Sequence, residues 1–215
     1  MRPENFIPAL SYDWLTPYYD VAVGLTTREK IFKTSLVAQA NIQAEHRVLD
    51  LACGTGTLTL LLKTMQPKAD VIGIDGDPKI LRIAKQKARA SNLVVKFDEG
   101  ISFELPYPDQ SFDRVLSSLF FHHLTREDKI RTIREVGRVL KPNGELHVAD
   151  WGRPDNKLMT VLSNGIKLLD GAETTTDNFD GLLPSFFSEC GFREITETSH
   201  FNTWFGTIRL LKAIK

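Results

Sequence analysis

Two glycines and one acid in the first third of the chain have the spacing of a nucleotide-binding turn. Gly54 and Gly56 follow the apolar run Val48-Leu-Asp-Leu51, and the residues from Thr57 onward have the composition of a helix. Glycines let a ligand approach the main chain, and the first N–H groups of a helix have no partner within the helix. Asp75 ends a second apolar run. In nucleotide-binding units of this kind, an acid about 20 residues beyond the glycines accepts hydrogen bonds from ribose hydroxyls. These residues predict a cofactor seat between a strand and a helix.

The turn does not complete the dinucleotide pattern. G-x-G-x-x-G needs a third small residue, whereas Gly54-Thr-Gly56-Thr-Leu-Thr59 ends in threonine. The form Asp50-x-x-x-Gly-x-Gly instead resembles the first motif of class I S-adenosylmethionine (SAM)-dependent methyltransferases. The resemblance extends over about residues 18–152, through three further segments in the same order: Gly73-Ile-Asp-Gly-Asp-Pro78, Leu105-Pro-Tyr-Pro-Asp-Gln-Ser-Phe-Asp113 and Arg138-Val-Leu-Lys-Pro-Asn-Gly-Glu-Leu146.

Within that class the chain is similar to the methyltransferase-11 type and to the ubiquinone and menaquinone C-methyltransferases. The resemblance implies SAM as the cofactor and S-adenosylhomocysteine as its product. It also implies methyl transfer to a small-molecule acceptor, for which an apolar or aromatic compound is one interpretation, since Phe120, Phe121 and Trp151 follow the fourth and fifth predicted strands. Whether the accepting atom is carbon, oxygen, nitrogen or sulfur is left open.

The resemblance assigns cofactor contacts to positions of this sequence. The predicted set is Asp50, Gly54 and Gly56 for the methionine end, Asp75 for the ribose, Gly76 and Ile101 beside adenine and Ser117 behind the sulfonium, with Ala52, Gly100 and Tyr19 completing it. Related sequences carry an acid where this chain has Ile101. Isoleucine can pack on adenine but cannot accept a hydrogen bond from its amine, so Asp98, Glu99, Ser102 or water would have to substitute.

His122 and His123 follow the predicted strand at 112–118 and are the candidates for catalysis. Either imidazole could take a proton from an acidic carbon, hydroxyl or thiol of an acceptor. The competing interpretation is that both begin the connection into the next helix and bond to backbone. No Cys or acid joins them at ligand spacing, so no metal site is expected.

Two other functions use the same glycine turn. One is a nicotinamide-dependent oxidoreductase, against which the missing third small residue counts. The other is a protein that holds SAM without turnover, for which the departure at Ile101 is the hint.

The elements that must position these residues alternate along the chain. Apolar runs at 46–52, 70–75, 93–98, 112–118 and 145–150 are separated by helical patterns, which predicts a parallel sheet with helices on both faces and ligands at its carboxyl edge. The extended runs 193–203 and 207–214 predict a hairpin. This arrangement is similar to the Rossmann-like methyltransferase sheet of seven strands, order 3-2-1-4-5-7-6, with the last strand antiparallel. A capping box at Thr26-x-x-Glu29 predicts a helix to about Ala40, Lys141–Gly144 is interpreted as a turn, and a helix at 155–170 is expected to precede a polar stretch at 171–178.

Length and composition indicate one domain over residues 1–215. Residues 1–44 form an arm and helix that are candidates for a lid, with Tyr19 and Arg28 as binding candidates there, and 155–183 would be a substrate-side insertion. Lys+Arg 27 balance Asp+Glu 27, which argues against wide contact with nucleic acid. Two cysteines, no signal segment and no apolar run long enough for a membrane span predict a cytoplasmic protein. The oligomeric state is left open.

Overall fold

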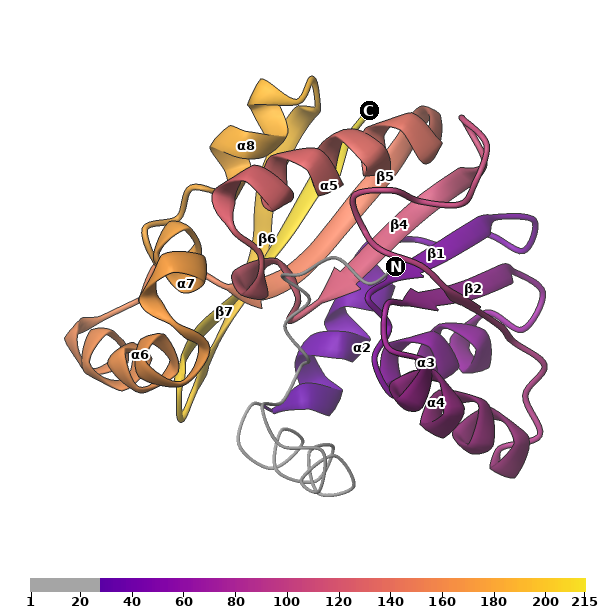
Figure 1. The fold of residues 1–215 in the computed structure, drawn as a ribbon, viewed down its shortest axis with the longest axis horizontal. Helices are drawn as coiled ribbons and strands as arrows, with labels where there is room; N and C mark the ends of the chain where they lie inside the picture. Colours follow the sequence, from indigo (N-terminus) through magenta and orange to yellow (C-terminus); the bar gives the residue numbers. More distant parts are fainter. Residues whose placement is uncertain (1–27) are drawn as a thin grey trace.

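A seven-stranded sheet lies at the centre of the computed structural model, which describes residues 28–215 except the side chains at 164, 166–170 and 172. The strand order is β3-β2-β1-β4-β5-β7-β6 (Figure 1). Neighbours from β3 to β5 run parallel, and β7 is antiparallel to both β5 and β6. The predicted fold class and strand order are therefore confirmed.

The strands and helices alternate until the C-terminal hairpin. The strands are β1 (Arg47–Leu51), β2 (Asp70–Asp75), β3 (Lys96–Glu99), β4 (Phe112–Ser118), β5 (Leu140–Trp151), β6 (Arg193–Thr203) and β7 (Gly206–Ile214). The helices are α2 (Glu29–Gln39), α3 (Thr57–Met65), α4 (Pro78–Ala90), α5 (Arg126–Val139), α6 (Lys157–Asp170), α7 (Ala172–Phe179) and α8 (Leu183–Glu189), with a short 3₁₀ helix η2 (Phe121–His123) after β4.

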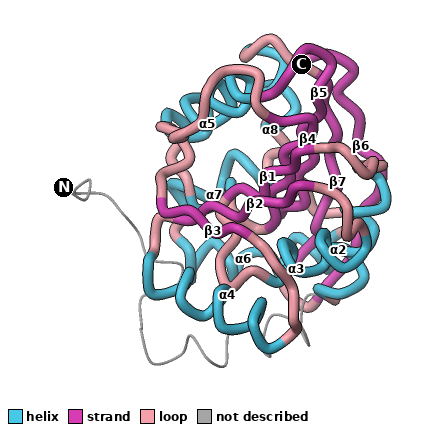
Figure 2. Tube along the Cα trace, turned by 90° about the vertical axis from the view of Figure 1, so that its right-hand side faces the viewer, coloured by secondary structure: helices cyan, strands magenta, loops and turns pink. Residues whose placement is uncertain are grey.

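Helices cover the sheet on two sides, as Figures 1 and 2 show: α2, α3 and α4 on one face and α5 and α8 on the other. The division follows the two-residue period of the strands. In β1, Val48 packs into the cluster with Phe32 of α2, whereas Leu49 packs into the cluster with Phe187 of α8. Burial on both faces fixes the strand register. Because β1, β2, β4 and β5 run parallel, their carboxyl ends meet at one edge of the sheet.

Residues 171–178, the polar stretch expected after the helix at 155–170, are helical for the most part. Most of them belong to α7, in which Thr175 and Asp177 are buried. Lys129 of α5 contacts this helix: it is fully buried and donates from Nζ to the carbonyls of Leu124 at 2.7 Å and Thr174 at 2.6 Å. Buried polar contacts hold this helix in place, and the hydrophobic pattern of the sequence carries no sign of them.

Two further boundaries differ from the prediction. Helix α2 begins at Glu29 with Arg28 as its N-cap at φ 59°, without a side-chain cap, and Thr26 lies outside the described residues. Lys141–Gly144 is part of β5 instead of a turn, at a point where the pairing with β4 shifts register and Asn143 has φ 62°. None of the helices in the described part of the chain has the length and apolar character that crossing a membrane requires.

Candidate functional site

The turn between β1 and α3 is built from left-handed backbone. Ala52, Gly54 and Gly56 have φ values of 55°, 55° and 79°. The Gly56 amide donates to the carbonyl of Cys53 at 2.9 Å, which closes the turn just before Thr57 starts α3. This is the strand–turn–helix arrangement that the sequence predicts.

The two glycines serve different purposes. A Cβ on Gly54 would meet nothing within 4 Å, so the space beside its main chain is open. A Cβ on Gly56 would lie 3.0 Å from Cβ of Ala84 and 3.2 Å from the ring of Phe97. Gly56 is therefore required for the packing of α3 against α4 and β3, whereas Gly54 leaves room for a ligand.

Asp75 lies at the glycine turn. Its Oδ2 accepts a hydrogen bond from the Gly54 amide at 2.9 Å, and its Oδ1 accepts one from the Asp77 amide at 2.9 Å. Burial raises the pKa of Asp75, and the amides of Asp77, Gly54 and Gly76 oppose that shift. Each carboxylate oxygen has a second lone pair, so a fixed Asp75 can still accept from ligand hydroxyls.

Asp50 lies beneath the turn and only 1% of its surface is exposed. Its Oδ2 accepts a hydrogen bond from the Thr59 hydroxyl at 2.5 Å. Burial raises the pKa of Asp50 to about 7. Thr59 stands where a dinucleotide motif has its third glycine, so the residue that breaks that motif is the one that holds Asp50. Asp50 thus joins β1 to α3 and stabilises the turn between them.

The carboxyl end of β4 contributes one polar atom that the sequence did not single out. Ser117, the predicted contact, donates from Oγ to the carbonyl of Leu51 at 3.2 Å. The next residue, Ser118, has a buried Oγ with no hydrogen-bond partner among the described residues. β4 is paired with β1 up to Leu51 and Ser117, so Ser118 follows at the end of the strand where the glycine turn begins. The alternation of a strand implies that only one of the two serines faces the site, but the sequence does not tell which.

The loop after β3 limits how adenine could be recognised. Ile101 is half-buried, and the Gly100 amide donates to the carbonyl of Asp75 at 3.1 Å. Ser102 is turned into the interior, where its Oγ lies 2.9 Å from Oγ1 of Thr132.

Of the two acids proposed to replace the missing one, Asp98 already accepts from Tyr107 at 3.0 Å and from Lys96 at 2.8 Å. Glu99 is exposed at the end of β3 and pairs in register with Asp75. Unlike Asp98, it makes no side-chain hydrogen bond to another described residue.

His122 is paired with an acid at the end of β5. Its Nδ1 lies 2.6 Å from Oδ1 of Asp150, and both side chains are almost fully buried. Asp150 also accepts from the amides of Trp151 at 2.7 Å and Phe120 at 3.1 Å. Burial alone would raise the pKa of Asp150, but His122 and the Trp151 amide outweigh it and the net shift is downward. Asp150 therefore holds the His122 ring in a fixed orientation.

His123 differs from its neighbour. The two rings are 3.9 Å apart between centroids, and burial together with His122 lowers the pKa of His123 to about 3. A neutral and very weakly basic imidazole is a poor proton acceptor at neutral pH. Among the described residues, no three His, Cys, Asp or Glu side chains are grouped as metal ligands would be.

The structure therefore brings most of the predicted residues to one edge of the sheet. Ala52, Gly54, Gly56, Asp75 and Gly76 form the turn and its acid, whereas Ser117, His122 and His123 follow from β4. Tyr19 lies outside the described residues. Three features of this edge fit SAM: the open space at Gly54, the Asp75 carboxylate held by an amide, and the buried Ser118 hydroxyl without a partner among the described residues. SAM has a narrow amino acid chain, ribose hydroxyls and N–H donors.

Comparison with known proteins gives an independent view. A family model described as "Methyltransferase domain" matches residues 48–144. The demethylmenaquinone methyltransferase of Thermus thermophilus is 42% identical over 143 residues, covering 66% of this chain and 62% of the relative. That of Deinococcus radiodurans is 34% identical over 146 residues, covering 67% and 60%. The chain thus spans about three fifths of the length of these relatives.

The fold is shared with solved structures at low identity. The crystal structure of YcgJ from Bacillus subtilis matches with a TM-score of 0.70 and 21% identity, over 85% of this chain and 97% of that one. A SAM-dependent methyltransferase from Aquifex aeolicus matches with a TM-score of 0.67 and 18% identity, over 95% and 99%. At this level of identity the likeness concerns the fold.

Proposed function

The chain belongs to the class I SAM-dependent methyltransferases, and from that premise we propose that it transfers a methyl group from SAM to a small molecule with an aromatic, quinone-like ring. The observation that carries the proposal is the contact between Asp75 and Gly54, because it joins the ribose acid to the turn that would receive the methionine end. The names of the two relatives, both demethylmenaquinone methyltransferases, support a quinone-type acceptor.

The residues of this chain bind and orient. The amide side of the glycine turn and the Ser118 hydroxyl would meet the amino acid end of the cofactor, and Asp75 would accept from its ribose. Bound SAM supplies a methyl group on a positively charged sulfur, which leaves as a neutral thioether. No acid is needed for such a leaving group, so catalysis depends on alignment and on exclusion of water.

Methyl transfer replaces one hydrogen of a neutral acceptor, so one proton must leave it. We assign that proton to Nε2 of His122, whose ring is oriented by Asp150 through the 2.6 Å contact. His123 remains neutral beside it. A ring hydroxyl of a reduced quinone is acidic enough to be activated by an imidazole in this way.

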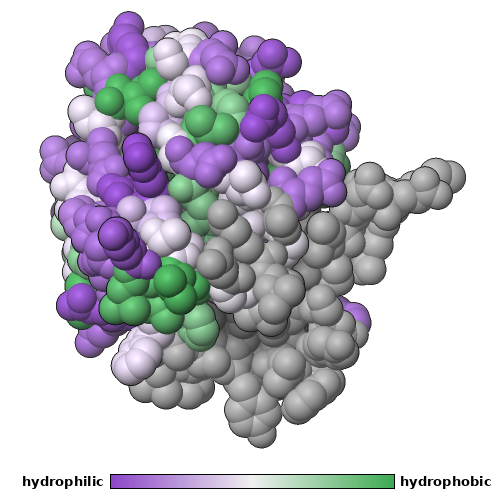
Figure 3. Space-filling model, turned by 90° about the vertical axis from the view of Figure 1, so that its left-hand side faces the viewer, coloured by the Kyte–Doolittle hydropathy of each residue, from purple (hydrophilic) through white to green (hydrophobic). Residues whose placement is uncertain are grey.

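The surroundings of this edge fit an apolar acceptor. Trp151 is buried at the end of β5, 6.4 Å from His122 between ring centroids. Leu158 and Val161 of α6 are exposed, as is Trp204 in the β6–β7 turn. Figure 3 shows a cluster of hydrophobic surface on the side of the molecule that carries α6 and α7.

The other two functions are not favoured. Thr59 fills the position of the third glycine, where the dinucleotide motif needs a small residue for close packing of the helix on the strand, and its hydroxyl is bonded to Asp50. A buried His–Asp pair at the carboxyl edge is more than a protein that only holds SAM would need.

Two free cysteines, Cys53 and Cys190, fit the cytoplasm as the proposed location.

The direct test is an incubation of the purified protein with methyl-labelled SAM and a water-soluble reduced naphthoquinone. We expect labelled acceptor and S-adenosylhomocysteine in equal amounts. A protein that binds SAM yet leaves every reduced quinone and phenol in a panel unlabelled would contradict the proposed acceptor class.

A further inference from the structure

A lysine of α4 is bonded to the glycine turn. Nζ of Lys87 donates to Oγ1 of Thr55 at 3.2 Å and to Oγ1 of Thr57 at 2.9 Å. Thr55 stands between Gly54 and Gly56, and Thr57 is the first residue of α3. One ammonium group thus joins the middle of the turn to the start of the helix that follows it.

The two threonine hydroxyls are held together by this ammonium group. Their Oγ1 atoms are 3.4 Å apart, which is longer than the separation of about 2.5–3.0 Å in an ordinary O–H···O hydrogen bond. Thr55 is buried and Lys87 is half-buried, so the contact is shielded from bulk water. Hydrogen bonds with one charged partner are roughly twice as strong as neutral ones. The bridge through Lys87 is therefore the stronger link between the two hydroxyls.

Lys87 points inward from a helix whose other cations are exposed, namely Lys79, Arg82, Lys85 and Arg89. Ala84 lies three residues before Lys87 and so on the same face of α4. A Cβ placed on Gly56 would lie only 3.0 Å from Cβ of Ala84, so α4 approaches the turn closely at this point. Close packing at Ala84 brings the Lys87 side chain within reach of the turn.

The charge of this lysine is unfavourable for α3 itself. Gly56 is the N-cap of α3 and provides no side-chain cap, and the first turn of the helix contains no acid. A cation beside the N-terminus of a helix opposes the helix dipole. What the two hydrogen bonds stabilise is therefore the shape of the turn.

Helix α4 contacts the predicted cofactor seat at two points. At its start, the amide of Asp77 donates to Oδ1 of Asp75 at 2.9 Å. Lys87 reaches the glycine turn from near the other end of the helix. The acid predicted to bind the ribose and the turn predicted to receive the methionine end are therefore held by the same helix.

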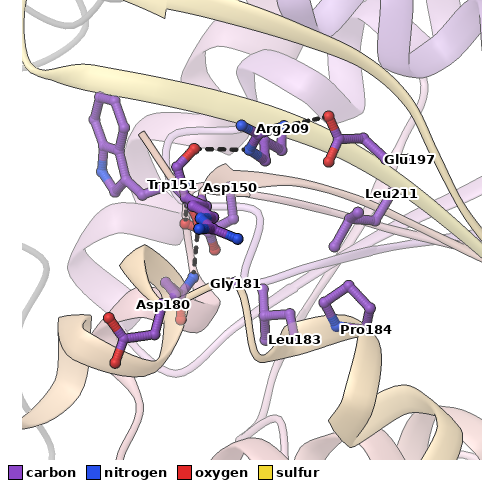
Figure 4. A pocket seen from close by; sticks show the side chains of 12 residues that line it. Asp150, Trp151, Asp180, Gly181, Leu183, Pro184, Glu197, Arg209 and Leu211 are labelled. Carbon is purple, nitrogen blue, oxygen red and sulfur yellow. Dashed lines mark hydrogen bonds and ion pairs between the residues drawn. The ribbon is translucent and has the colours of Figure 1, made fainter. Parts of the chain in front are cut away.

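The end of β5 takes no part in this contact. Asp150 and Trp151 lie there beside a hollow that the ion pair between Arg209 and Glu197 borders (Figure 4). Lys87 and the two threonines are not among the residues that line this hollow. A substitution of Lys87 should therefore act on the cofactor turn.

We propose that Lys87 is a positioning residue for the cofactor, which holds the glycine turn in its binding conformation before SAM arrives. Glycine loses more conformational entropy than any other residue when it becomes fixed, and Gly54 and Gly56 flank the tethered Thr55. A turn that is already fixed loses less entropy on binding, which raises the affinity. The inference rests on the proposed cofactor seat and is independent of the methyl acceptor.

Titration calorimetry of the full chain with S-adenosylhomocysteine tests this role. Lys87→Met keeps an unbranched stem but removes the donor, so we expect the affinity to fall by about 10-fold. Lys87→Arg keeps charged donors for both hydroxyls and should bind within about threefold of the wild type. Lys85→Met changes an exposed lysine of the same helix and is the matched control, with unchanged affinity expected. Each variant is measured well below its own unfolding temperature.

A double-mutant cycle separates the tether from a general effect on stability. Thr55→Val with Thr57→Val removes both acceptors and should weaken binding about as much as Lys87→Met does. Adding Lys87→Met to that pair should cause no further loss, whereas independent effects would add. The threonine pair retains Lys87 and is compared directly with the wild type, so the test also holds if Lys87→Met fails to fold.

The outcomes distinguish this proposal from the cofactor seat on which it rests. A wild type that does not bind S-adenosylhomocysteine would overturn both. A wild type that binds would overturn the role of Lys87 alone in any of three cases: Lys87→Met or the threonine pair binds equally well, Lys87→Arg binds as weakly as Lys87→Met, or the losses in the cycle are additive.

Discussion

The carboxylate of Asp75 and the main chain of Gly54, 21 residues apart in sequence, are joined by a hydrogen bond of 2.9 Å. The bond links the end of β2 to the turn after β1, two elements that are adjacent in the sheet. It fixes the acid before a ligand arrives, so less conformational entropy is lost on binding. The cofactor seat is thus a preorganised unit, and its parts can be tested separately.

Substitution of the two glycines should separate ligand space from packing. Gly54→Ala adds a methyl group in open space at φ 55°, so we expect a stability loss of about 1–2 kcal/mol and a large loss of S-adenosylhomocysteine affinity. Gly56→Ala adds strain and a contact of 3.0 Å with Ala84, so the stability loss should be larger, about 3 kcal/mol. Urea unfolding and titration calorimetry measure the two effects, and equal stability losses would contradict the distinction.

The main features of this seat were predictable because they are local. A glycine turn between a strand and a helix is written in consecutive residues, and Asp75 follows at a characteristic distance. The sequence does not reveal that Gly56 is needed for packing on Ala84 and Phe97, since those residues come from α4 and β3. Distant contacts of this kind appear only when the sheet is assembled.

Asp50 should make stability depend on pH. Its folded pKa is raised by burial to about 7, above the ordinary value of 3.8, so the folded state binds the proton more tightly than the unfolded state. Its contribution is present in full at low pH and is lost as pH rises between about 4 and 7. Asp50→Asn lacks this titration and keeps an acceptor for Thr59. The unfolding free energy of the wild type, relative to the variant, should fall across that window in urea titrations. A constant difference from pH 4 to 8 would be the contrary result.

His122 should matter for turnover far more than His123. We expect His122→Gln and Asp150→Asn to lower kcat by about 10²- to 10⁴-fold, because the first removes the proton acceptor and the second its orientation. His123→Gln is the matched control and should lower kcat by less than about 10-fold, since the pKa of His123 is near 3 and the ring does not accept a proton at neutral pH. Similar losses for both histidines would exclude His122 as the specific base.

Lys129 should control the order of α7. Lys129→Met removes two hydrogen bonds, to Leu124 and Thr174, and the 3.8 Å ion pair with Asp177, while Arg126 continues to pair with Asp177. We expect a stability loss on the order of 3 kcal/mol from the buried carbonyls that lose a charged donor. Limited proteolysis should then cleave within 157–179 faster than in the wild type. Arg131→Met on the exposed side of α5 is the control, and equal cleavage rates would refute the role.

The parts that sequence reasoning missed share one physical cause. Asp150 lies at the end of β5 and His122 in η2 after β4. The two residues are 28 apart in sequence, and their pairing depends on β4 and β5 being neighbours in the sheet. α7 is polar in composition and contacts the buried Lys129 through a backbone carbonyl, which hydrophobic periodicity could not predict. Ser118, in contrast, was one residue away from the predicted Ser117, and only the strand's orientation separates them.

The central claim is that Asp75, at the end of β2, and the glycine turn after β1 bind the cofactor together. Titration of the wild type with S-adenosylhomocysteine should give saturable binding of one ligand per chain, and Asp75→Ala should weaken it by about 1–3 kcal/mol, from the loss of hydrogen bonds to the ribose. Asp70→Ala, at the exposed opposite end of β2, is the control and should bind as the wild type does. Absence of wild-type binding at millimolar ligand, or an unchanged affinity in Asp75→Ala, would contradict the account.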